Sequence, residues 1–281
     1  MLWRDGRLHE GTVASFDLAD RGLLLGDGVF DTAMALGGTV VQEDAHLARL
    51  ADAATALGFA VDLGEARTAM RAVAGGSARA AIRTTATRGP GPRGLRPPAD
   101  PRPVLWASAA PLRPGTVFAD LSLGWSAIRR NETSPASRHK TLGYLDAVLA
   151  AEAAARDGHD EALFLNMQGR VACAGTGTLF AVFGREVVTP PAREGVLAGI
   201  VRARVLALAS GLDLTAAERP VAPEELSAAE AVFLTNSLRL IAPVRRIGER
   251  SYASDGHPAV RALRTALVRE IVAACGVAPE G

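Results

Sequence analysis

The amino-acid sequence predicts an α+β fold in two domains. Short apolar runs typical of strands and amphipathic runs typical of helices are interspersed along the whole chain. A proline-containing stretch, PLRPG at residues 111–115, separates the two halves and is typical of a linker. We therefore expect a small N-terminal α/β domain over residues 1–112, a linker over 113–116 and a larger C-terminal domain over 117–281.

The N-terminal half contains strands, helices and loops. The Gly-Asp-Gly turn in residues 21–36 lies between two apolar runs, so we expect a loop that leads into a strand. Apolar residues at helical spacing predict helices over 43–57 and about 64–75. The proline-rich stretch at 89–103 predicts a loop. Further strands are expected at residues 2–8, 38–42, 78–89 and 104–110.

The C-terminal half begins with an extended stretch at 117–129 and a polar loop, RRNETSPASRHK. An alanine-rich segment then predicts a helix that ends at Gly158, and apolar periodicity predicts helices over 195–212 and about 257–275. The remaining strands are expected at residues 161–166, 171–175, 178–183 and 187–191, as a largely antiparallel meander, and as a pair within 228–248.

The bulk composition argues against several classes of protein. The chain has 281 residues and a formal net charge of +1, so it presents no overall field for nucleic acid or anionic membrane. Its two cysteines, Cys173 and Cys275, have no ligand-like spacing around them, which argues against a disulfide framework and a zinc site. The N-terminus lacks an apolar signal core, and no segment approaches about 18 uninterrupted apolar residues. We therefore expect a cytoplasmic protein that binds neither nucleic acid nor membrane.

Four features could together bind a phosphorylated cofactor. Lys140 follows a polar loop and precedes a helix, where its amine could form a Schiff base, although a solvated lysine is the simpler interpretation. The amides of Ile200 and Val201 follow a glycine at a helix start, which is either an anion site or only a cap. The turn at 235–237 offers amides and a hydroxyl, and Arg49 offers positive charge. A phosphate site and a Schiff-base lysine together indicate pyridoxal 5'-phosphate (PLP).

Other catalytic motifs do not occur in the sequence. Neither GxSxG nor GxxxxGK[ST] is found, which argues against an α/β-hydrolase and a P-loop protein. The five histidines have no ligand spacing, so no metal site is expected.

Seven motifs follow one another along nearly the whole chain: RGLLLGDGVFDT, HLARL, TRGPGPRG, RRNETSPASRHKTLGYL, EALFLNMQGRV, VTPPAREGVLAGIVR and FLTNSLRLIAPV. Their order and spacing resemble the class IV aminotransferases, which are fold-type IV PLP enzymes. This family includes branched-chain and D-amino-acid aminotransferases and 4-amino-4-deoxychorismate lyase. The resemblance implies a homodimer with a small N-terminal α/β sandwich lobe, a larger C-terminal pseudo-barrel lobe and the cofactor between the lobes.

The resemblance also implies roles for individual residues. Lys140 would form the Schiff base and move protons at the substrate's Cα, and Tyr144, one helical turn later, would contact the cofactor's phenolic oxygen. Arg93 would bind a substrate carboxylate across the dimer. The phosphate would be bound by Arg49, Ile200, Val201 and Ser237. The substrate contacts would come from Phe30, Arg88, Arg93 and Asn236.

The chain departs from the family pattern at several of these positions. Cys173 stands where the family has a glutamate that keeps the cofactor's pyridine nitrogen protonated, and so makes the ring a strong electron sink. A neutral thiol offers only a weak hydrogen bond, which favours elimination over transamination, whereas a thiolate would restore a negative partner. Thr178 replaces an asparagine, Val201 a threonine, and Met34 an arginine near the substrate.

Three functions are consistent with these residues. The leading hypothesis is a lyase similar to 4-amino-4-deoxychorismate lyase, which forms 4-aminobenzoate and pyruvate on the route to folate. The alternative is an aminotransferase for branched-chain or D-amino acids with a 2-oxo acid as acceptor. A third is a catalytically impaired homologue that only binds PLP.

Overall fold

The computed structural model describes residues 1–280, which divide into two compact units. Unit 1 contains Met1–Arg113, together with His139–Gly143 and Ala274–Ala278. Unit 2 contains Pro114–Arg138, Tyr144–Ala273 and the end of the chain from residue 279. The chain therefore leaves unit 1 after Arg113 and returns to it for two short segments.

Unit 1 is built on a six-stranded sheet in the order β2-β1-β6-β5-β3-β4, in which every neighbouring pair is antiparallel. The longest strand pairing joins β3 to β5, from Gly28 opposite Thr87 to Leu36 opposite Arg79. The expected strand at 78–89 is thus confirmed. The strands are β1 (Leu2–Arg4), β2 (Arg7–His9), β3 (Gly28–Leu36), β4 (Thr39–Val40), β5 (Arg79–Thr87) and β6 (Val104–Pro111).

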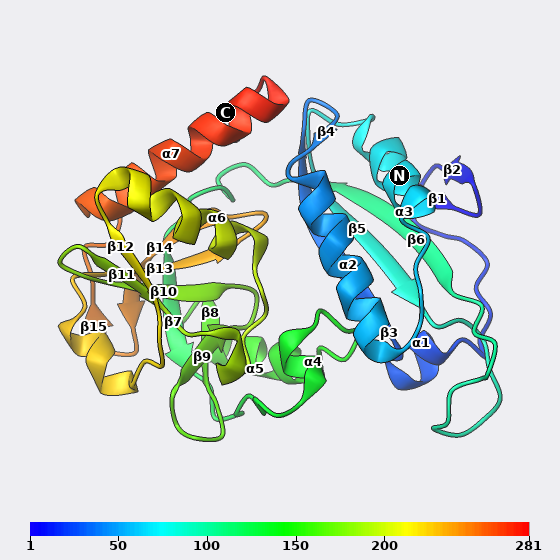
Figure 1. Ribbon diagram of the computed structural model, residues 1–281, viewed down its shortest axis with the longest axis horizontal. Helices are drawn as coiled ribbons and strands as arrows, with labels where there is room; N and C mark the ends of the chain where they lie inside the picture. The colour runs from blue at the N-terminus through cyan, green and yellow to red at the C-terminus, as the bar shows by residue number, and fades with distance from the viewer. Residues whose placement is uncertain (281) are drawn as a thin grey trace. The chain divides into compact units, whose positions relative to one another are not determined.

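Two helices cover one face of this sheet (Figure 1). The helix α2 (Glu43–Leu57) packs on β3, and α3 (Leu63–Ala74) packs on β5 and β6. Their apolar sides, with Leu50 and Met70, share a buried core with alternate strand residues such as Ile82. Both helices lie where the apolar spacing predicts them, because that spacing puts the apolar residues on one helical face.

The start of unit 1 differs from the expectation in two places. The first expected strand is a hairpin, because Asp5 and Gly6, with φ of 52° and 75°, turn the chain between β1 and β2. The apolar run before the Gly-Asp-Gly turn is a short helix, α1 (Arg21–Leu25). The side chain of Asp20 caps its N-terminus, and Gly26, with φ of 66°, ends it.

Unit 2 is built on a nine-stranded sheet in the order β12-β11-β10-β13-β14-β7-β8-β9, with β15 paired to β14. Three pairs are parallel: β11 with β12, β14 with β7, and β7 with β8. Leu163, Val232 and Val244 belong to the core on one face of the sheet. The strands are β7 (Leu121–Trp125), β8 (Glu161–Leu165), β9 (Val171–Ala174), β10 (Thr178–Phe183), β11 (Glu186–Thr189), β12 (Thr215–Glu218), β13 (Ala231–Asn236), β14 (Leu240–Ile247) and β15 (Arg250–Ser251).

The helices of unit 2 pack on this sheet and on one another. The helix α5 packs on β8, and α6 packs on β12 and β13. Arg204 of α6 donates to Glu270 of α7, which joins these two helices. The helices are α4 (Pro135–Arg138), α5 (Leu145–Arg156), α6 (Ile200–Ala209) and α7 (Pro258–Cys275), with short 3-10 turns at Ala192–Glu194, Ser210–Leu212 and Pro223–Ala228.

The predicted meander is wrong in its order. The pairs β8 with β9 and β10 with β11 are antiparallel as expected, but β10 next pairs with β13, and β8 with β7. Strands that are distant in sequence therefore separate the two expected hairpins. Alternation of apolar residues identifies a strand and its buried face, but it does not identify the neighbouring strand.

Across residues 1–280, no helix is both long enough and apolar enough to cross a lipid bilayer.

We expect Gly89→Ala to destabilise unit 1 strongly. Gly89 has a φ of +87°, and an added Cβ would overlap the carbonyl group of Arg102 across the base of the proline-rich loop. We estimate a loss of about 3 kcal/mol in the free energy of unfolding, because steric overlap adds to the backbone strain. Urea denaturation of the purified variant measures it.

Gly94→Ala is the matched control in the same loop. Gly94 has a φ of +108° but nothing within 4 Å of the added Cβ, so only the backbone strain applies. We expect a loss of about 1 kcal/mol. Equal losses for the two variants would show that the contact with Arg102 is unimportant.

Candidate functional site

Lys140 lies in an extended segment that is hydrogen-bonded to β3. The amide of Phe30 donates to the carbonyl of Lys140 at 2.9 Å, and the amide of Leu142 donates to the carbonyl of Gly28 at 3.0 Å. The helix α5 begins only at Leu145. The helix expected to follow Lys140 directly therefore begins later than expected, because residues 140–142 pair with a strand instead of forming a first helical turn.

Lys140 is the only lysine in the sequence. An arginine guanidinium stays protonated in proteins, whereas a lysine ammonium can lose its proton when its pKa is lowered. Of these two cationic side chains, only lysine therefore forms Schiff bases. The Nζ atom of Lys140 lies 4.3 Å from the centroid of the Phe30 ring, and the guanidinium carbon of Arg83 lies 3.5 Å from the same centroid. Two cations therefore share one aromatic ring in unit 1.

A buried charge cluster orients Arg49. The carboxylate of Asp31, on β3, accepts hydrogen bonds from Nε and Nη2 of Arg49 at 2.7 and 2.9 Å. Nδ1 of His46 lies 2.5 Å from the same carboxylate. Asp31 and His46 are 2% and 1% exposed, so the cluster is almost entirely out of solvent. Two of the three nitrogens of the Arg49 guanidinium are therefore held by Asp31 within unit 1.

The pKa of Asp31 reflects these contacts. Burial by itself raises this pKa. The hydrogen bonds and charges of His46 and Arg49 lower it by more than burial raises it, so the pKa of Asp31 lies below its usual value. Asp31 is therefore a carboxylate at neutral pH. A fixed negative charge holds Arg49 by two hydrogen bonds, which restricts the orientation of the guanidinium.

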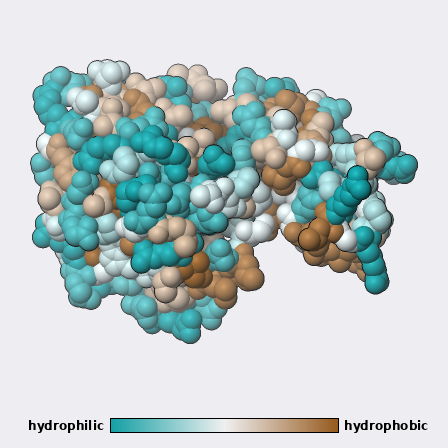
Figure 2. All heavy atoms as spheres, turned by 60° about the horizontal axis from the view of Figure 1, so that its bottom comes forward, coloured by the Kyte–Doolittle hydropathy of each residue, from teal (hydrophilic) through white to brown (hydrophobic). Residues whose placement is uncertain are grey.

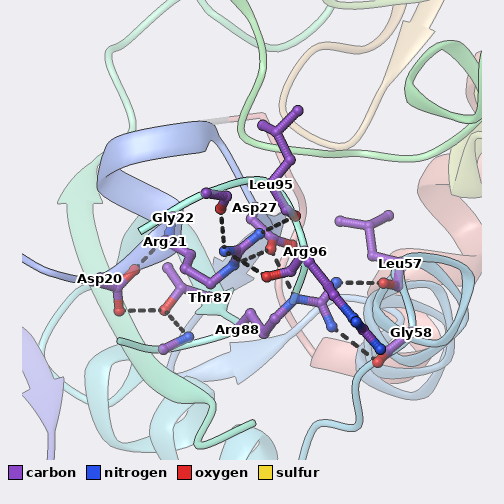
Figure 3. Close-up of polar contacts among 12 residues, drawn as sticks. Asp20, Arg21, Gly22, Asp27, Leu57, Gly58, Thr87, Arg88, Leu95 and Arg96 are labelled. Carbon is purple, nitrogen blue, oxygen red and sulfur yellow. Dashed lines mark hydrogen bonds and ion pairs between the residues drawn. The ribbon is translucent and has the colours of Figure 1, made fainter. Parts of the chain in front are cut away.

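Arg88 belongs to a second buried cluster, shown in Figure 3. Its Nε donates to Asp27 at 2.8 Å, and its two terminal nitrogens donate to the carbonyls of Leu57 and Gly58, at the end of α2. Each nitrogen of Arg88 thus has an acceptor within unit 1. The substrate contact expected for Arg88 stays a prediction, and the observed contacts hold the end of α2 against β3.

Arg21 uses the same Asp27 to position the proline-rich loop (Figure 3). Its Nε donates to Asp27 at 2.8 Å, and its terminal nitrogens donate to the carbonyls of Gly94, Leu95 and Arg96. Arg93, beside these carbonyls, is exposed. The loop that carries Arg93 is therefore fixed by a buried guanidinium.

The start of α6, in unit 2, has the open amides expected for an anion site and is called the α6 cradle below. Gly199 is the N-cap and offers no side chain, and the first helical hydrogen bond runs from Ala203 to Gly199, so the amides of the first turn, at Ile200 and Val201, have no helical acceptor. An added Cβ on Gly199 would lie 3.2 Å from Oγ1 of Thr178. The expected helix over 195–212 thus begins later, at the glycine that opens the cradle.

A buried hydroxyl lies next to this cradle. Thr178 pairs with Thr235 across β10 and β13. Thr235 is 3% exposed, and its Oγ1 has no hydrogen-bond partner within residues 1–280. An unsatisfied buried hydroxyl costs free energy unless a ligand or water satisfies it. A phosphate at the start of α6 would supply the missing acceptor.

The remaining expected cofactor and substrate residues of unit 2 lie in turns. Asn236 accepts hydrogen bonds from the amides of Leu238 and Arg239 at 3.0 and 2.7 Å, so its carboxamide oxygen shapes the turn that contains Ser237. Tyr144 is the N-cap residue of α5, with extended chain before it, and therefore does not lie one helical turn after Lys140. Its cofactor contact stays a prediction.

Cys173 lies on β9 among charged residues. Arg130 and Glu161 lie close enough to Cys173 to influence the pKa of its thiol. Burial raises the pKa of the thiol, Glu161 raises it further, and Arg130 only partly opposes them. Cys173 is therefore a neutral thiol rather than a thiolate.

Sequence reasoning missed the groups that orient the expected site residues. Asp31, His46 and Asp27 carry the buried contacts of unit 1, and Arg130 and Thr235 carry those of unit 2. All five lie inside the quoted motifs, but only Thr235, in the turn at 235–237, belongs to a segment that the sequence analysis assigned to a site. The unique lysine was the signal that could have identified Lys140 without any resemblance.

We expect Asp31→Asn to lower the free energy of unfolding by about 3 kcal/mol at neutral pH, because two buried partners lose their acceptor. The pKa of Asp31 in the folded protein lies below the value of about 3.9 in an unfolded chain. The carboxylate therefore contributes its full stability above that value and loses it as the pH falls through the folded pKa. Urea denaturation at neutral and acidic pH should show the difference between the proteins shrinking in acid.

Asp52→Asn, on the exposed side of α2, is the control and should change little. The role given to the Asp31 charge would be contradicted if Asp31→Asn lowered the free energy of unfolding by the same amount at neutral and at acidic pH.

We expect Cys173 to show no thiolate below the pKa of a free cysteine, about 8.5, because burial raises its pKa. Ultraviolet titration of thiolate absorbance in a Cys275→Ser background isolates this residue. A thiolate signal at neutral pH would sink the assignment of a neutral thiol.

The chain is similar to known proteins over most of its length. The family model for class IV amino-transferases matches residues 28–247. A candidate branched-chain-amino-acid aminotransferase of Methanocaldococcus jannaschii is 32% identical over 259 residues, which cover 89% of this chain and 88% of the relative. An aminodeoxychorismate lyase of Bacillus subtilis is 26% identical over 279 residues, which cover 96% of this chain and 94% of the relative.

Solved structures have the same fold. The crystal structure of 4-amino-4-deoxychorismate lyase from Pseudomonas aeruginosa matches with a TM-score of 0.87 and 31% identity, covering 96% of this chain and 99% of that chain. The expected α+β, fold-type IV architecture is therefore confirmed. Enzymes of this kind depend on PLP, and they include both aminotransferases and lyases. The chain belongs to the class IV aminotransferase family.

Proposed function

We propose that this protein is a PLP-dependent lyase similar to 4-amino-4-deoxychorismate lyase, forming 4-aminobenzoate and pyruvate. The observation that carries the proposal is the neutral thiol of Cys173, at the position where a glutamate is expected. Without a carboxylate, the pyridine ring is a weaker electron sink. Transamination suffers more from this loss than an elimination that expels a leaving group. The lyases of Bacillus subtilis and Pseudomonas aeruginosa among the similar proteins support it.

Both units carry residues whose chemistry suits PLP. Unit 1 offers Lys140 for the carbonyl carbon and Arg49 for the phosphate. Unit 2 offers the first-turn amides of α6 and the unsatisfied hydroxyl of Thr235, which suit phosphate oxygens. When bound, PLP would accept the electron pair released at the substrate carbon that bears the amine.

The amine of Lys140 would move the proton in this reaction. It would take the proton from the carbon that bears the substrate amine. The bond from the neighbouring ring carbon to the ether oxygen would then break, so that the enol of pyruvate leaves and the ring becomes aromatic. Arg93, on its fixed and exposed loop, would bind a substrate carboxylate.

The second candidate is an aminotransferase for branched-chain or D-amino acids. The similarity to the candidate branched-chain enzyme of Methanocaldococcus jannaschii favours it. In this reaction Lys140 would carry the proton from the substrate's Cα to the C4′ carbon of PLP, and a 2-oxo acid would accept the amino group.

We further propose a cytoplasmic homodimer. Leu23, Leu24 and Leu25 of α1 are 58%, 61% and 47% exposed, and Leu95, whose carbonyl Arg21 binds, is 83% exposed. Hydrophobic areas interrupt the hydrophilic surface on the face drawn in Figure 2. A monomer rarely leaves such neighbouring leucines in water, so a second copy of the chain is the proposed cover. The proposed cytoplasmic location rests on the two cysteines, which form no disulfide framework.

We expect borohydride reduction of the protein with PLP to attach the cofactor to Lys140. Since Lys140 is the only lysine, the only other primary amine is the N-terminus, and peptide mass spectrometry separates the two. Lys140→Ala should lose both the adduct and the visible Schiff-base absorbance, and His139→Ala should keep them. PLP bound nowhere, or only at the N-terminus, would remove the enzyme proposal.

We expect rapid release of pyruvate from aminodeoxychorismate and no rapid conversion to the pyridoxamine form with L-leucine or D-alanine. Single-turnover absorbance spectroscopy with each compound makes the comparison. Rapid conversion with an ordinary amino acid would instead establish the aminotransferase, and a bound cofactor without any reaction would indicate an impaired homologue.

A further inference from the structure

Arg130 and Cys173 approach each other on one face of the sheet in unit 2. The amide of Arg130 donates to the carbonyl of Leu165 at 2.9 Å, which fixes its backbone beside β8. Its guanidinium carbon lies 4.3 Å from the centroid of the Phe164 ring. The strands β8 and β9 are antiparallel, with Leu163 opposite Ala174 and Leu165 opposite Val171. The register shifts between these two pairs, so Ala172 and Cys173 together lie across from Phe164, over which the guanidinium of Arg130 stacks.

This face is the one opposite the main core of the unit. Leu163 and Ala174 belong to that core, and alternation along the strands turns their neighbours Phe164 and Cys173 the other way. The same argument applies to Thr178, which precedes the core residue Leu179 on β10. Thr178, which lies beside Gly199 at the start of α6, and Cys173 therefore lie on one face of the sheet, at the two ends of the turn from β9 to β10.

The donors of Arg130 are not all used within the protein. Its Nε atom is buried and has no hydrogen-bond partner in the described part of the chain. The nearby carboxylate of Glu161 already accepts from Oγ1 of Thr176 at 2.6 Å and from the amide of Ala162 at 3.2 Å. Near Cys173 there is therefore a guanidinium whose Nε has no acceptor within the described residues, and a carboxylate that accepts from other groups.

We propose that Arg130 is the partner of the pyridine nitrogen of bound PLP, to which it donates a hydrogen bond, so that the nitrogen remains unprotonated. The inference rests on the proposed PLP function and names the group that takes the place of the expected glutamate. A guanidinium keeps its proton and carries positive charge. A positive charge beside a base lowers the pKa of that base, which is the reverse of the effect of a carboxylate.

The chemical consequence is a neutral pyridine ring. A neutral ring withdraws electrons less strongly than a protonated one. It therefore favours a reaction in which the electron pair leaves with a leaving group rather than staying on the ring. Elimination with formation of an aromatic product satisfies this condition. Arg130 therefore accounts for the same preference as Cys173, by adding a positive charge where the thiol only omits a negative one.

Nitrogen-15 NMR of the holoenzyme, reconstituted with PLP labelled at the ring nitrogen, tests this inference directly. In the unaltered protein we expect the resonance of an unprotonated pyridine nitrogen, unchanged from neutral to mildly acidic pH. Arg130→Gln should move the resonance toward that of a protonated ring in mild acid, and Cys173→Glu should do so at neutral pH. Arg130→Lys keeps a cation and should resemble the unaltered protein.

Arg129→Gln is the matched control, because Arg129 is the exposed neighbour of Arg130 and should leave the resonance in place. A protonated ring nitrogen in the unaltered holoenzyme would overturn the inference, as would equal shifts in the Arg129 and Arg130 variants. Both of these results require bound PLP. Failure of the proposed function is different, because in that case no PLP binds and borohydride leaves no adduct on Lys140.

Discussion

The strand β3 is the constraint on which unit 1 depends. Its outer edge pairs with the segment that carries Lys140, and its inner edge pairs with β5 along the full length from Gly28 to Leu36. Asp31, within the strand, holds Arg49, and Asp27, just before it, holds Arg21 and Arg88. One strand therefore sets the positions of the lysine, of the expected phosphate-binding arginine and of the loop with Arg93.

Buried carboxylates orient arginines in both units. Asp31 is 2% exposed, and in unit 2 Glu194, also 2% exposed, accepts hydrogen bonds from Arg170 and from the carboxamide of Asn166. A buried charge is costly unless it is paired and hydrogen-bonded, so each of these groups strongly restricts its partners. The result is a set of guanidinium groups whose orientations are fixed before any ligand binds, which reduces the cost of binding.

The chemistry proposed for unit 2 follows from charge. A family site that places a carboxylate near the cofactor ring stabilises a protonated nitrogen, whereas Cys173 and Arg130 offer a neutral thiol and a cation. The helices α4 and α5 separate these two residues in the sequence. They come close because Arg130 is hydrogen-bonded to β8, and β8 pairs with β9, which carries Cys173. The family relationship leaves the reaction open, because relatives include aminotransferases and lyases. The proposed distinction between the two reactions therefore rests on the local charge at Cys173 and Arg130.

The sequence by itself determined the fold class, most of the strands and helices, and the family, because alternation, helical spacing and ordered motifs are local properties of the chain. It also contained a single lysine, which left one candidate for the Schiff base. The tertiary structure decided which strands are neighbours, that Lys140 is attached to β3 rather than to the start of a helix, and that Asp31, Asp27 and Arg130 contact the expected site residues. These contacts join residues distant in sequence, and no local periodicity encodes them, because they arise only when sheets pair and side chains pack.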